Sequence, residues 1–134
     1  MLEPLQIPLK KDKSLEDIKK ALTVFNYTEK IKTNLIMASS LLEFLGGIRD
    51  ESEAAGAEKL LVAYLNALIV EVNIAANASR VEGFRDIASQ LQEAAEQLRQ
   101  HNYTVVQRFI SEAISSATTF GSWAAQTLKE KDLI

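Results

Sequence analysis

The chain has 134 residues, of which 47% are hydrophobic, 25% charged and 7% aromatic, as expected for one globular domain and not for a disordered or fibrous chain. Fifteen basic against eighteen acidic residues leave a net charge of −3, so we expect no nucleic-acid partner and no attraction to an anionic membrane. There is no cysteine, which excludes disulfides, thiolate nucleophiles and zinc–thiolate sites. Since a secretory signal pattern is also lacking, we expect a cytoplasmic protein.

Residues 1–13 are predicted to form an extended N-terminal arm. Both prolines of the chain, Pro4 and Pro8, lie in this segment, and proline disfavours an α-helix. Apolar residues recur along the arm, so we expect it to dock on an apolar groove of the same or a neighbouring chain. These apolar residues are Leu2, Leu5, Ile7 and Leu9.

Residues 14–134 are predicted to form a single all-α domain, because this part has no proline and its apolar residues recur at helical spacing. A first helix should begin at Ser14, a favourable N-cap residue, and end at Gly46 and Gly47. A second helix should begin after Asp50 or Ser52, since Asp50 and Glu53 have the spacing of a capping box.

Two interpretations of the next boundary stay open. In the first, Asn77 takes a left-handed C-terminal position and Ser79 and Glu82 form a capping box, which gives a tight turn at 77–80 and a third helix from Arg80 to about Gln100. In the second, one long helix crosses this region, because a heptad pattern runs through it without a break. We favour the turn, since four helices of similar length can close a core. The heptad positions are Leu60, Ala63, Ala67, Val70, Ile74, Asn77, Val81, Phe84, Ala88, Leu91, Ala95 and Leu98.

The fourth helix should follow His101 and Asn102, with Thr104 and Gln107 as its capping box. The predicted fold is therefore an antiparallel four-helix bundle preceded by the arm. The alternative is three helices, with one very long central helix, intertwined in an oligomer.

The sequence offers little for catalysis, and we predict no catalytic residue and no cofactor. His101 is the only histidine, and its position at a helix end favours capping over a role as general base. Four acidic residues of the third helix share one face, which suggests a divalent-metal-dependent phosphohydrolase as an alternative function. This face points away from the apolar one, so a solvated ridge is the favoured interpretation. The four acids are Glu82, Asp86, Glu93 and Glu96.

A second alternative is a small-ligand pocket inside the bundle. Glu71 is the only charged residue between Leu60 and Ala76, and Asn66 and Asn73 lie near it in sequence. Burial of such a carboxylate would mark a binding site, whereas a lysine or arginine partner would give it a structural role.

The leading expectation is a non-enzymatic assembly module that forms a dimer or larger homo-oligomer. The second helix is apolar around most of its circumference, and the fourth has no charge between Ala113 and Leu128. A row of small hydroxyl residues along the fourth helix would let another helix approach closely. The predicted interface consists of Ser111, Ser115, Thr118, Ser122 and Trp123 in the fourth helix and Val62 and Ile69 in the second.

Overall fold

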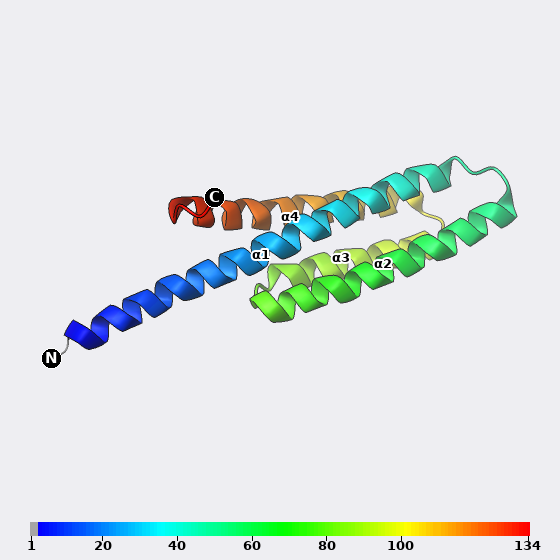
Figure 1. The fold of residues 1–134 in the computed structure, drawn as a ribbon. Helices are drawn as coiled ribbons and strands as arrows, with labels where there is room; N and C mark the ends of the chain where they lie inside the picture. The colour runs from blue at the N-terminus through cyan, green and yellow to red at the C-terminus, as the bar shows by residue number, and fades with distance from the viewer. Residues whose placement is uncertain (1–2) are drawn as a thin grey trace.

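A computed structural model describes residues 3–134, with side chains from residue 15 onward. This part of the chain forms four helices joined by short connections, and each packs against the next (Figure 1). α1 also packs against α4, which closes the ring. The fold is the predicted all-α antiparallel four-helix bundle. Its helices are α1 (Glu3–Gly46), α2 (Glu51–Ser79), α3 (Gly83–Arg99) and α4 (Tyr103–Glu130).

The arrangement of the helices determines which faces can meet a partner. α2 contacts α1 and α3, and α4 contacts α3 and α1, but within the described residues α2 and α4 do not contact each other. They therefore lie diagonally across the bundle. The outward faces of α2 and α4 consequently point in opposite directions.

All four helices contribute to the core, which is built from aliphatic residues and Phe84. Burying a leucine, isoleucine or phenylalanine of this kind contributes about 1.5–3 kcal/mol. Small residues bring α1 and α4 close together: a Cβ placed on Gly121 would lie 3.1 Å from Oγ1 of the buried Thr28. The largest fully buried side chains include Ile31, Leu35, Leu65, Ile87, Leu91, Leu98, Ile110 and Leu128.

The N-terminal segment differs from the prediction. α1 begins at Glu3, so residues 3–13 are helical where the prolines predicted an extended arm. Pro4 lies in the first turn, where backbone amides have no intrahelical partner, and Pro8 lies further inside the 44-residue helix, where a proline disfavours but does not forbid the helical backbone. The first turns of α1 extend beyond the other helices (Figure 1). The predicted docking of the arm's apolar side chains lies outside the described side chains.

The buried face of α1 is regular in its C-terminal half, where Ile31, Leu35, Ala38, Leu42 and Leu45 are all buried. Nearer the N-terminus Leu15 and Leu22 are exposed. Their place in the core is taken by Ala21 and Val24. The apolar pattern changes phase near Thr28, whereas the helix continues without a break, so the earlier apolar positions rotate towards solvent.

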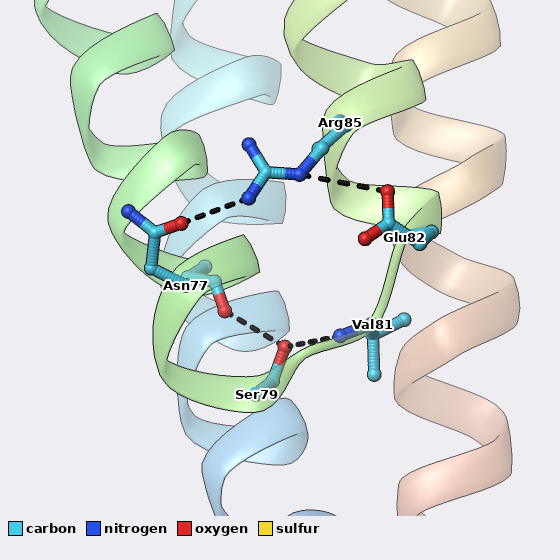
Figure 2. Close-up of polar contacts among 6 residues, drawn as sticks. Asn77, Ser79, Val81, Glu82 and Arg85 are labelled. Atoms are coloured by element: carbon cyan, nitrogen blue, oxygen red, sulfur yellow. Dashed lines mark hydrogen bonds and ion pairs between the residues drawn. The ribbon is translucent and has the colours of Figure 1, made fainter.

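The predicted turn between α2 and α3 is confirmed, and one continuous helix over residues 52–101 is wrong. The left-handed residue is Arg80, with φ 60°, and not Asn77. Figure 2 shows how Ser79 closes the turn: its hydroxyl donates to the Ala75 carbonyl (2.7 Å) and accepts from the Val81 amide (3.1 Å). Asn77 instead accepts a hydrogen bond from Arg85 of α3, at 2.9 Å.

The predicted caps have mixed outcomes. The Asp50 carboxylate accepts from the Glu53 amide at 2.9 Å, as predicted. The Ser79–Glu82 box does not form, because Glu82 is itself the N-cap residue, in helical conformation, and its carboxylate pairs with Arg85. The Thr104–Gln107 box does not form either. α4 already begins at Tyr103, and the Gln107 side chain hydrogen-bonds to the hydroxyls of Ser39 on α1 and Ser111.

Candidate interaction surface

The outward face of α2 is an apolar stripe on the surface of the bundle. The buried residues of α2, such as Leu61, Leu65 and Val72, fill its inward face. On the opposite face Leu60 is 75% exposed, and Val70 and Ile74 are more than half exposed. Together with Gly56, Ala63 and Ala67, these three residues recur at intervals of 4-3-4-3-4, which is the spacing by which one helix packs on another. This α2 stripe comprises Gly56, Leu60, Ala63, Ala67, Val70 and Ile74, all exposed.

An apolar groove between α1 and α2 adjoins the stripe. It has a volume of about 440 Å³ and an almost entirely apolar lining. Phe44 on its rim is 74% exposed, and Leu60 belongs to both the groove and the α2 stripe, which makes the two surfaces continuous. The groove is lined by Leu41, Phe44, Leu45, Ala57, Leu60, Leu61 and Tyr64.

Glu71 lies at the junction of α1 and α2, where its carboxylate is 3.7 Å from Nζ of Lys30. Nearby, the Tyr64 hydroxyl donates to the Asn34 carbonyl at 3.2 Å, and burial, followed by the neighbouring Glu71 charge, raises the pKa of Tyr64 above its usual value of 10.0. A cavity of about 100 Å³ is located here. Neither Asn66 nor Asn73 lines it, so the structure does not assemble the predicted ligand pocket.

The residues of the predicted interface fall on separate surfaces. The hydroxyl row of α4 is exposed, and Trp123 is about half exposed. Val62 is partly buried against the core, and Ile69 is a core residue. Since α2 and α4 lie diagonally, one flat interface cannot use the outward faces of both. The exposed hydroxyl row comprises Ser111, Ser115, Thr118 and Ser122.

The four acids of α3 form an exposed ridge. Glu82 pairs with Arg85 and Glu96 with Arg99, each at 3.5 Å. Within the described part of the chain, no three histidine, cysteine or acidic residues are grouped so as to hold a metal ion. The ridge, which also includes Asp86 and Glu93, is thus a solvated face carrying local ion pairs.

His101 belongs to a polar cluster that the sequence did not reveal. It has φ 64°, and the His101 and Asn102 amides donate back to the Leu98 and Gln97 carbonyls, which ends α3 in a Schellman motif. Its Nδ1 lies 2.7 Å from Oε2 of Glu58 on α2.

Tyr103 completes this cluster, because its hydroxyl donates to the same Glu58 oxygen at 2.7 Å. Burial, then the hydrogen bond and the charge of Glu58, raise the pKa of Tyr103 to about 12. The cluster fastens the α3–α4 turn to α2. Glu58 and His101 are 43 residues apart, and only the antiparallel arrangement of the helices brings them together.

Among the described residues, α2 is the one helix that is long and apolar enough to cross a membrane, judged by length and composition. Its inward leucines pack against the rest of the bundle, and a core helix of a soluble protein has the same composition. The hydropathy of α2 therefore results from two apolar faces, one in the core and one exposed.

No protein family, no curated protein and no solved structure matches this chain.

Proposed function

We propose that this protein is an assembly module that pairs with a second copy of itself through the α2 stripe and the adjoining groove. The observation that carries the proposal is the exposure of Leu60, Val70 and Ile74 at heptad spacing on a face that no other part of the bundle covers. Apolar surface of this extent is stabilised by removal from water, at roughly 25 cal/mol per Å².

The groove adds residues of α1 to the surface that is available for pairing. A stable interface buries about 800 Å² on each partner, which is more than one narrow helix face supplies. Leu41 and Phe44 of α1 widen the surface, since they border the groove that Leu60 shares with the α2 stripe.

The charges near the stripe favour a protein partner over a lipid surface. Helices that lie on a membrane usually carry many lysines and arginines beside their apolar face. From Gly56 to Ala78 the α2 helix carries Lys59 as its only cation, and the whole chain has a net charge of −3. The lack of cysteine is compatible with assembly in the cytoplasm, which we propose as its location.

A pair of matched substitutions tests the proposal by sedimentation velocity at micromolar concentration. Val70→Glu places a charge in the α2 stripe, and Trp123→Glu places one at a similarly exposed apolar residue of α4. Because an unpaired charge is costly to bury, we expect Val70→Glu to weaken dimerisation at least about 100-fold and Trp123→Glu to leave it unchanged. Dissociation by Trp123→Glu alone would move the interface to α4 and contradict the proposal.

The groove supports a second candidate function, the binding of a small apolar ligand. Its volume of about 440 Å³ lies within the range of about 300–1,000 Å³ that is typical of ligand sites, and its lining is apolar. Native mass spectrometry of the purified protein tests this function. A retained small molecule that is lost in Leu60→Glu would support it, and a mass equal to that of the bare chain would count against it.

A further inference from the structure

We infer that the two copies pair their α2 helices antiparallel, about a twofold axis at the level of Leu65. This inference rests on the proposed self-association and adds its geometry. It follows from the order of large and small residues in the α2 stripe and from the polar residues on its two flanks.

The α2 stripe is complementary to its own reversed copy. About an axis at residue 65, Leu60 faces Val70 of the second copy, and Ala63 faces Ala67. The small alanines then lie at the centre, where they let the two helix axes approach closely. At each end Gly56 faces Ile74, and a Cβ placed on Gly56 would have no neighbouring atom within 4 Å, so there is open space for the isoleucine.

The flanks of the stripe are compatible with the same register. In an antiparallel pair each flank meets the same flank of the other helix. On one flank Asn66 lies beside Asn66 of the second copy, and the two side-chain amides can hydrogen-bond to each other. On the same flank Lys59 lies beside Asn73 of the second copy. No like charges are brought together there.

The other flank carries Ala57, Tyr64 and Glu71. Tyr64 meets its own copy, and Ala57 meets Glu71. The Glu71 carboxylate keeps its ion pair with Lys30 of its own chain, 3.7 Å away, although its Oε1 accepts no hydrogen bond within the described residues.

A parallel pair is less complementary. It would place Ile74 against Ile74 and Gly56 against Gly56, so the gap between the helices would be uneven along their length. It would also bring Asn66 beside Glu71 instead of beside a second amide. Both differences favour the antiparallel pair.

The absence of native cysteine makes disulfide cross-linking a clean test of this geometry. We expect the Asn66→Cys variant to form a disulfide-linked dimer on mild oxidation, because the two copies of residue 66 lie near the axis. In the Ile74→Cys variant the two cysteines would be about 27 Å apart along the helices, so no cross-link should form. Ser89→Cys, at an exposed position of α3, measures cross-linking by random collision.

The outcomes separate the geometry from the proposed function. A cross-link in Asn66→Cys and none in Ile74→Cys supports the inference. The reverse result would show a parallel pair and overturn it. A dimeric mass with neither cross-link would also overturn the antiparallel geometry, but it would leave the proposed self-association intact. A monomeric mass for the parent chain and all variants would overturn both the geometry and the self-association.

Discussion

Gly83 of α3 packs directly against the aromatic ring of Phe120 on α4. A Cβ at position 83 would overlap the ring at Cζ and lie 2.7 Å from Cε2. The same ring makes an edge-on contact with Phe84, with centroids 5.6 Å apart and planes at 60°. The side-chain-free residue at the start of α3 therefore allows Phe120 to reach Phe84.

Replacing Gly83 by alanine should destabilise the bundle by about 1–3 kcal/mol, because the added methyl group displaces the Phe120 ring. Urea unfolding followed by circular dichroism measures this change. Gly46→Ala is the control, since a Cβ there meets nothing within 4 Å. Phe120→Leu in the Gly83→Ala background should recover part of the loss. If both alanine variants unfold at the same urea concentration, the packing described for Gly83 is incorrect.

Arg80 provides a second prediction, because it holds a left-handed backbone conformation with φ 60° between α2 and α3. This conformation costs a non-glycine residue roughly 1–2 kcal/mol. Glycine avoids this cost, but part of the gain is offset because glycine makes the unfolded chain more flexible. Arg80→Gly should therefore stabilise the protein by up to about 1 kcal/mol in thermal unfolding. Arg80→Ala, which removes the side chain but keeps the strain, should not. Equal stability of the two variants would argue against strain at this turn.

The Tyr103–Glu58 contact predicts a loss of stability at alkaline pH. In the unfolded chain a tyrosine ionises near pH 10.0, whereas Tyr103 in the bundle stays protonated up to about pH 12. The raised pKa thus contributes stability below pH 10 that is lost as the pH rises towards 12. Phenylalanine at this position removes the titrating group. From about pH 9 to about pH 11.5, the urea concentration at the midpoint of unfolding should decrease more in the parent chain than in Tyr103→Phe. Equal decreases in the two proteins would contradict the raised pKa.

The number of helices and most of their ends were predictable because the signals are local. Asp50 lies three residues before the amide that it caps, and Ile31 to Leu45 follow one helical period. The turn at 77–80 was predictable, but its left-handed residue is Arg80 and not Asn77, because α2 continues to Ser79, and the Asn77 side chain instead binds Arg85 of the next helix. Such a contact depends on tertiary structure.

The site was harder to predict for the same reason. The heptad pattern of α2 is visible in the sequence, but it indicates neither which face turns outward nor that Phe44 borders that face. Both follow from the inward packing of Leu61, Leu65 and Val72. Similarly, Gly83 packs against Phe120 of α4 and His101 contacts Glu58 of α2, and no spacing rule connects these residues.

The mass of the parent chain in solution tests the central claim most directly. Multi-angle light scattering on the protein at micromolar concentration should give twice the chain mass of 14.9 kDa, because the exposed α2 stripe is buried between two copies. The mass should fall towards that of one chain on dilution of Val70→Glu but not of Trp123→Glu. A mass of 14.9 kDa for the parent chain, unchanged as its concentration is raised, would contradict the account.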